Sequence, residues 1–181
     1  MKLDLSFWTH ASSKRKRIYL IMFVFAVAFL LVAIGASIPI SHQTANQLYD
    51  YFNQTVAQNK ASGTVPQYIF LNNFRVCLPL FIPVFGPAYG VLSFVTTGYI
   101  LGAEAQVLGF PPLLYVAALV FDPIFWLEFT AYSIGIAESI WLLRRLTQKR
   151  YWEIKNTAIL IGICAALLVV GAIIESMLPL I

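Results

Sequence analysis

The stretch FLNNFRVCLPLFIPVFGPAYG, residues 70–90, decides how this chain folds. Two asparagines and an arginine lead into an apolar run that three prolines and two glycines interrupt. Polar groups such as Asn72, Asn73 and Arg75 are costly to bury without partners, and an internal proline breaks the helical hydrogen-bond ladder. The stretch therefore predicts polar groups that join helices at the head of a broken helical hairpin.

The composition of the whole chain places this hairpin in a bilayer. The 181 residues are 60% hydrophobic and 11% charged, with a mean hydropathy of +0.78. Ordinary soluble domains carry about 25% charged residues, so too few polar side chains remain here to cover a soluble core. We expect an all-α, multi-pass integral membrane protein of the plasma membrane with about five transmembrane segments.

Two basic clusters predict the orientation of these segments. Lys14–Arg17 and Arg144–Lys155 both flank apolar runs, and the positive-inside rule places such clusters in the cytoplasm. Both fall inside only if residues 68–104 cross twice, as a hairpin that turns near residues 85–87. The N-terminus is then inside and the C-terminus outside. The clusters are also expected to contact anionic lipid headgroups, and no nucleic-acid-binding motif accompanies them.

The chain is expected to form a single membrane domain, residues 1–181, divided by charge and hydropathy. Its predicted parts are a cytoplasmic leader 1–17, a first span 18–40, an external segment 41–67, hairpin arms 68–85 and 88–104, a proline-kinked segment 111–143, a basic loop 144–155 and a last span 156–178. The first half of the external segment has the spacing of an amphipathic helix. The NQT tripeptide at Asn53 matches a glycosylation sequon, which is too short a pattern to argue from.

Ionisable residues inside the apolar segments need partners, because a charge in hydrocarbon is expensive. Arg75 is expected to form an ion pair with Glu104 or Asp122. Asp122 and Glu128 have two interpretations, as polar groups that hold helices together or as part of a proton or ion path. Together with Glu138 they do not repeat at helical spacing, so no single stripe of carboxylates is predicted, and the structural interpretation is preferred.

Small residues predict close helix packing further along the chain. Gly98 and Gly102 form a GxxxG pattern, which lets two helix backbones approach. The residues expected to hold the central packing are Asn72, Asn73, Arg75, Gly98, Gly102, Glu104, Asp122 and Glu128.

The sequence offers little for catalysis. Cys77 and Cys164 are far apart and lie in apolar runs, and His10 and His42 stand alone. There is no metal-ligand spacing, no nucleophile elbow and no phosphate-binding glycine loop. We therefore expect a non-enzymatic chain with no metal or cofactor of its own, although a carboxylate contributed to a site shared with another subunit stays open.

Three segments resemble the stage II sporulation protein M family of bacteria and archaea. They are Ile69–Val76 with its Asn-Asn pair, Thr97–Gly102, and Pro123 followed by Glu128. Thr97 stands where the family has Asn, and Ile124 and Phe125 stand where it has His and Gly. The resemblance covers roughly residues 66–145. It implies a five-helix membrane fold and, by analogy with the family's scaffold in a peptidoglycan-remodelling complex, a role in assembly.

These observations predict a scaffold or accessory subunit whose partners are other integral membrane proteins. A sharper version is a subunit of a respiratory or monooxygenase complex. The rival from another class is a small ion- or proton-coupled transporter or channel that uses Asp122 and Glu128.

Overall fold

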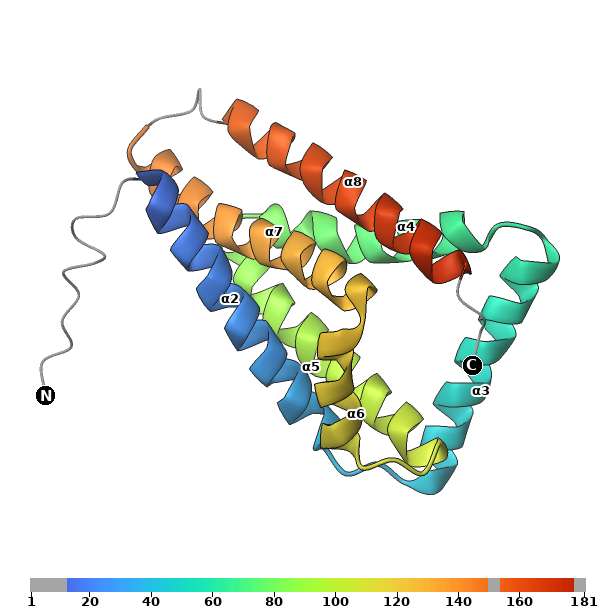
Figure 1. Cartoon of the computed structure of the whole chain (residues 1–181). Coiled ribbons are helices and arrows are strands. Elements are labelled where there is room, and N and C mark those ends of the chain that lie inside the picture. The colour runs from blue at the N-terminus through green and yellow to red at the C-terminus, as the bar shows by residue number, and fades with distance from the viewer. Residues whose placement is uncertain (1–12, 150–153, 178–181) are drawn as a thin grey trace, which may run out of the picture.

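The computed structural model describes residues 13–149 and 154–177, and every regular element in these ranges is helical (Figure 1). Most of the predicted leader, and residues 150–153 of the predicted basic loop, lie outside the described residues. The elements are α2 (Ser13–Ala36), α3 (His42–Ala61), α4 (Val65–Cys77), the 3-10 helix η1 (Leu78–Phe81), α5 (Phe85–Val107), α6 (Pro112–Ala118), the 3-10 helix η2 (Leu119–Phe121), α7 (Pro123–Thr147) and α8 (Ile154–Met177).

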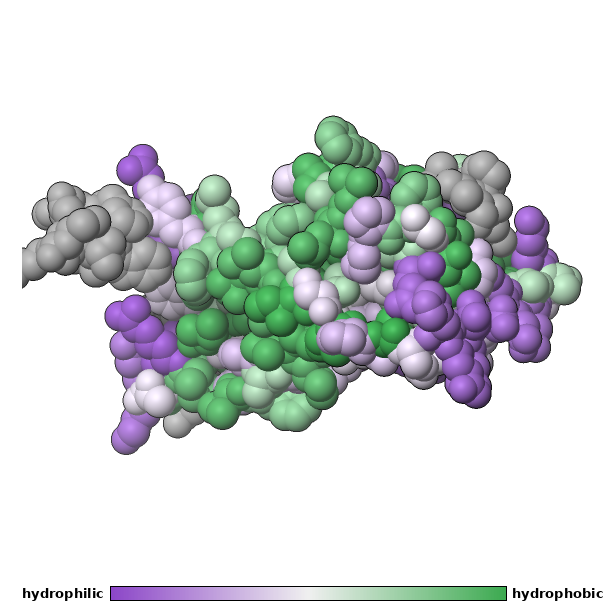
Figure 2. Space-filling view, turned by 90° about the horizontal axis from the view of Figure 1, so that it is seen from below, coloured by the Kyte–Doolittle hydropathy of each residue, from purple (hydrophilic) through white to green (hydrophobic). Residues whose placement is uncertain are grey.

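Two of these helices are long and apolar enough to cross a membrane. They are α2, over Lys14–Ala36, and α8, with mean hydropathies of 2.9 and 2.8. A third candidate is the pair formed by Phe85–Val107 and Pro112–Phe121, which is bent by 111°. Figure 2 shows the matching surface, an apolar band between hydrophilic patches at its two ends. The prediction of an all-helical protein with membrane-spanning helices is thus supported at this coarser level.

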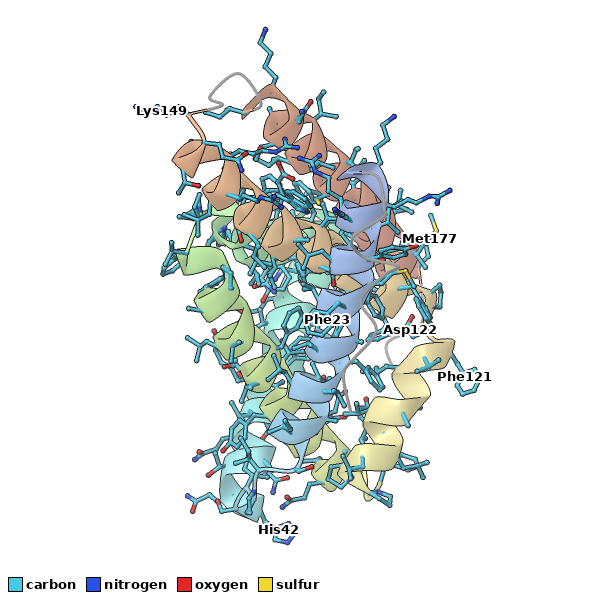
Figure 3. All side chains as sticks on the ribbon, turned by 90° about the vertical axis from the view of Figure 1, so that its left-hand side faces the viewer. Phe23, His42, Phe121, Asp122, Lys149 and Met177 are labelled. Atoms are coloured by element: carbon cyan, nitrogen blue, oxygen red, sulfur yellow. The ribbon has the colours of Figure 1, made fainter. Side chains whose placement is uncertain are left out.

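Helices from distant parts of the sequence lie side by side, with α2 against α5 and α7 against α8, whereas α3 runs at a steep angle to α2 and α5 (Figure 1). The start of α2, the end of α7 and the start of α8 meet at one end of the bundle, which we call the basic end. At this end Arg17 of α2 contacts Glu138 of α7, and Thr157 of α8 bonds the same carboxylate. Figure 3 shows Lys149 at this end and His42, the first residue of α3, at the other.

In the middle of the bundle, two cysteines bond the same backbone carbonyl of α7. The Sγ atoms of Cys77 and Cys164 both donate to the oxygen of Ala131, at 4.0 and 3.3 Å. Both cysteines are fully buried and free. The end of α4 therefore reaches the same level as the middle of α8, and rings such as Phe125 and Phe129, 4.2 Å apart between centroids, fill the core nearby.

The hairpin turns earlier than the sequence predicted. We expected a break at residues 85–87, whereas α4 ends at Cys77, η1 follows, and α5 already begins at Phe85. Pro79 lies in η1 and Val84 has a positive φ of 69°, so the turn uses residues 78–84. Pro87 does not break α5 because it lies in the first turn, where a missing N–H costs no helical hydrogen bond.

The predicted segment 111–143 is two helices joined at Asp122. α6 and η2 end there, and α7 begins at Pro123 in the position that proline favours. α7 also continues to Thr147. Arg144 and Arg145 therefore belong to the last turns of a helix instead of the predicted loop.

α2 and α5 pack backbone against backbone at three glycines. A methyl group added at Gly98 would lie 2.1 Å from the oxygen of Val32, and one at Gly102 would lie 2.7 Å from the oxygen of Ala36. From the other side, a methyl group at Gly35 of α2 would lie 2.1 Å from the oxygen of Val95. The GxxxG pair thus lies on the helix face that contacts α2, together with a glycine that the sequence analysis did not select.

Candidate functional site: a carboxylate-lined cavity

A cavity of about 540 Å³ lies in the half of the bundle nearer α3. We call it the acidic cavity. Four carboxylates line it, together with several amides, aromatic rings and one lysine: Glu104, Asp122, Glu128, Glu175, Asn53, Asn59, Asn72, Asn73, Tyr49, Phe52, Tyr68, Tyr115, Phe125, Phe129 and Lys60. Since the acids outnumber the single base, the cavity carries a negative potential when they are ionised and favours cations or protons.

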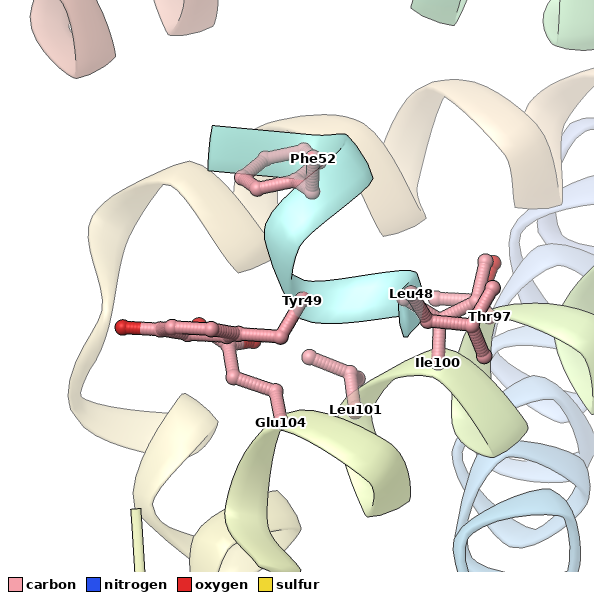
Figure 4. A pocket seen from close by; sticks show the side chains of 7 residues that line it. All are labelled: Leu48, Tyr49, Phe52, Thr97, Ile100, Leu101 and Glu104. Atoms are coloured by element: carbon pink, nitrogen blue, oxygen red, sulfur yellow. The ribbon is translucent and has the colours of Figure 1, made fainter. Parts of the chain in front are cut away.

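α3 forms one wall of this cavity and a smaller adjoining pocket of about 180 Å³. In Figure 4, Leu48 and Tyr49 of α3 face Leu101 and Glu104 of α5 across the pocket. The helix begins at a Ser41 cap that accepts a hydrogen bond from the N–H of Thr44. Of the apolar side chains on this face of α3, Val56 is buried and Leu48 and Tyr49 are half-buried, whereas Phe52 lines the pocket and is exposed.

One polar contact of the cavity joins α4 to α7. The side-chain amide of Asn73 donates a hydrogen bond to Oε1 of Glu128. Both residues are partly buried and line the cavity. An amide N–H donates to a carboxyl oxygen in either protonation state, so this contact joins α4 to α7 without fixing the charge of Glu128.

The remaining carboxylates come from the ends of three other elements. Glu104 is near the end of α5, where Tyr115 of α6 faces it, and Glu175 is near the end of α8. Glu128, Asp122 and Glu175 are close enough to interact electrostatically. Glu175 and Tyr115 were not among the predicted site residues, because a carboxylate at a helix end and a tyrosine in an apolar run carry no spacing signal.

Asp122, which lines the cavity, is also the N-cap residue of α7. Its Oδ1 accepts a hydrogen bond of 2.9 Å from the N–H of Ile124 and thereby caps α7. Such a cap stabilises a helix by about 0.5–2 kcal/mol. We expect Asp122→Ala to lower the free energy of unfolding by about 1 kcal/mol, whereas Asp122→Asn, which keeps an accepting oxygen, changes it little.

Thermal unfolding in detergent checks this prediction, with a thiol-reactive dye that reports exposure of the two buried cysteines, Cys77 and Cys164. The isosteric Asn variant is the matched control for the lost charge. Equal losses in the Ala and Asn variants would mean that the charge of Asp122, and not its cap, stabilises the fold.

The structure gathers five of the eight predicted site residues around one cavity: Asn72, Asn73, Glu104, Asp122 and Glu128. Gly98 and Gly102 instead contact α2. The predicted ion pair of Arg75 is wrong, because Arg75 is exposed on α4 and pairs with neither acid, whereas Arg17 forms an ion pair with Glu138. The two acids expected to pair with Arg75 have other neighbours: Tyr115 faces Glu104, and the side chain of Asp122 caps α7.

The basic end is closed by a buried polar cluster that the sequence analysis did not predict. Arg17 lies 3.3 Å from Glu138, whose side chain is 3% exposed, and Thr157 donates to the same carboxylate at 2.8 Å. The guanidinium groups of Arg17, Arg144 and Arg145 lie 5.4–5.8 Å from the ring centroid of Trp141, within cation–π range. The cavity is thus separated from the basic end by packed side chains.

The groups that line the cavity are suited to binding by charge and hydrogen bonds. Within residues 13–149 and 154–177, no three His, Cys, Asp or Glu side chains converge as ligands for a metal ion. The cavity offers charge, amide hydrogen bonds and aromatic walls. The fold and this site define a helical membrane protein with a carboxylate-lined cavity near one end.

No family model, curated protein sequence or solved structure matches this chain. The resemblance of residues 66–145 to the stage II sporulation protein M family therefore stays a prediction.

Proposed function

We propose that this chain is a non-catalytic scaffold or accessory subunit of a larger complex of integral membrane proteins. In this proposal five segments cross the plasma membrane: α2, α4 with η1, α5, α6 with η2 and α7, and α8. The basic end faces the cytoplasm, as the positive-inside rule favours. The clusters Lys14–Arg17 and Arg144–Lys155 contact anionic lipid headgroups there.

The observation that carries the proposal is the position of Arg75. It lies two residues before Cys77, whose sulfur meets Ala131 at the level of the middle of α8. Its side chain is exposed and forms no ion pair with any described residue. A charged side chain at this depth normally faces a protein interior and finds a partner, so its exposure supports a surface that another membrane protein covers.

Gentle detergent extraction of the native protein, followed by size separation and mass spectrometry, tests the proposal. We expect a particle much larger than the 20.3 kDa chain that contains other integral membrane proteins in fixed ratio. Recovery of the chain alone, as a monomer or homo-oligomer, in several mild detergents would contradict it. The identity of the partners would also decide whether the complex is a respiratory or monooxygenase enzyme.

A second candidate function, cation- or proton-coupled transport, is favoured by the acidic cavity. The cavity reaches from the α3 end down to Glu128 and Asn73, and a packed ionic cluster closes the opposite end. A cavity open to one side and closed to the other is what alternating access requires. In this reading Asp122 and Glu128 bind the cation or proton.

Reconstitution in liposomes separates this candidate from the first. Transport predicts a proton or cation flux that Glu128→Gln abolishes and Asp122→Asn lowers, whereas Asp50→Asn, an exposed site on α3 outside the cavity lining, leaves it unchanged. Absence of flux in the intact protein for protons and common cations would count against transport.

A further inference from the structure

One face of α4 and η1 is exposed along its length. Leu71, Arg75 and Leu78 follow each other at spacings of four and three residues, which places them on one helix face, and all three are exposed. Ile82, which follows η1 inside the turn, is exposed too. We call the row Leu71, Arg75, Leu78 and Ile82 the α4 face.

The α4 face lies at the depth of the hydrocarbon core. Cys164, which meets the same carbonyl as Cys77, is ten residues after the start of α8 at Ile154 and thirteen before its end at Met177. With a rise of about 1.5 Å per residue, this point lies near the middle of the span. Arg75 is two residues from Cys77, so its Cα lies about 3 Å away along the helix axis.

We infer that the α4 face binds a transmembrane helix of a different protein, and that this helix carries a carboxylate near the middle of its span. The apolar residues of the row fit the side chains of a lipid-embedded helix, and Arg75 supplies a charge that only an acid at the same depth neutralises. This inference rests on the proposed function and adds to it the place of contact and the chemistry of the partner.

A second copy of this chain does not fit the α4 face. In a two-fold dimer the same patch meets itself, which would bring Arg75 against Arg75. The described residues also offer no acid to a neighbouring copy at this depth, because Asp50 is the one exposed carboxylate among them and it lies on α3. A lipid phosphate fits no better, since the headgroups lie about 15 Å from the bilayer centre.

Site-specific photo-crosslinking in native membranes tests the inference. A photoreactive residue replaces Leu71 or Leu78 on the α4 face, and Phe23, which is also exposed but lies on α2, is the matched control. We expect crosslinks from Leu71 and Leu78 to one integral membrane protein with Asp or Glu inside a transmembrane segment, and none to that protein from Phe23.

Charge reversal then tests the pairing itself. Arg75→Leu and Arg75→Glu should lower the crosslink yield by about tenfold or more, as loss of a desolvated charge pair does, and Arg75→Lys should retain most of it. Replacement of the partner's carboxylate with Lys should restore the yield in Arg75→Glu. Because Arg75 is exposed, the melting temperature of each variant should stay that of the unmodified protein.

Three results would overturn the inference: crosslinks to lipid or to a second copy only, a partner without an intramembrane acid, or a yield that Arg75→Glu leaves unchanged. If the extracted particle keeps its partners in Arg75→Leu, the proposed function stands and the α4 face is the wrong surface. If the unmodified protein extracts alone, the proposed function itself fails.

Discussion

The Gly98→Ala variant is expected to unfold at a much lower temperature than the unmodified protein, because the added methyl group has no room. It would lie 2.1 Å from the oxygen of Val32 and 2.9 Å from the nitrogen of Ala36. Both are backbone atoms of α2, so the clash is relieved only if the two helices separate. Overpacking of a core costs about 1–3 kcal/mol, and a backbone clash places this variant at about 3 kcal/mol, the upper end.

Gly162→Ala on α8 is the matched control for this prediction. A methyl group there would meet no atom within 4 Å, and alanine favours a helix over glycine by about 1 kcal/mol. Its melting temperature, read with the thiol-reactive dye on the buried Cys77 and Cys164, should stay unchanged or rise. A Gly98→Ala protein as stable as the Gly162→Ala protein would mean that α2 and α5 are farther apart than the structure places them.

The α2–α5 contact illustrates what the sequence could reveal. The spacing of Gly98 and Gly102 predicted a packing face, because GxxxG places two small residues on one side of a helix. Gly35 has no such signal, since a single glycine in an apolar run has no spacing to read. Its role depends on the register of α2 against α5, which only the three-dimensional arrangement provides.

The acidic cavity shows why spacing along one helix is a limited test. Asp122 and Glu128 do not lie on one helical stripe with Glu138, and this spacing argued against a shared path. In the structure Glu138 belongs to the basic end, whereas Glu104 and Glu175 arrive from other helices to join Asp122 and Glu128. When the residues of a site come from several helices, no single helix sequence shows them at a regular spacing.

The sequence predicted that the helices would break, but it did not predict the residues at which the hairpin turns. The sequence indicated a broken hairpin and a kink at Pro123, and the structure contains breaks near both places. The hairpin turn differs because Pro87 is compatible with a first helical turn, while Pro79 and Pro83 lie where the chain leaves α4. Sequence alone does not indicate which of three closely spaced prolines begins a helix and which ends one.

Arg17 was read from the sequence as one member of a basic cluster that sets topology. Nothing in a run of four basic residues distinguishes the one that turns inward. The structure selects it, because Arg17, the fifth residue of α2, lies at the level of Glu138 on α7, 121 residues further along the chain. Thr157 and Trp141 also contact this ion pair, and the sequence did not predict it. Their contacts form only because the start of α2, the end of α7 and the start of α8 meet in the fold.

Removal of this inward-facing cation is expected to produce the second large loss of stability. Arg17→Gln leaves the carboxylate of Glu138 buried, 3% exposed, with Thr157 as its hydrogen-bond donor. Breaking one side of a buried ion pair costs about 3–5 kcal/mol. Lys14→Gln removes the same charge from the same cluster at an exposed position, so it controls for altered topology and should change the melting temperature little.

The double variant Arg17→Gln with Glu138→Gln distinguishes a lost partner from lost packing. Removing both charges leaves no isolated ion in the interior, and replacement of whole buried pairs is often neutral or stabilising. The double variant should therefore be more stable than Arg17→Gln alone, with the melting temperature again read at Cys77 and Cys164. If Glu138→Gln brought no recovery, the guanidinium of Arg17 would be stabilising the bundle through its stacking on Trp141, and the closure of the basic end would depend on aromatic packing instead of on charge.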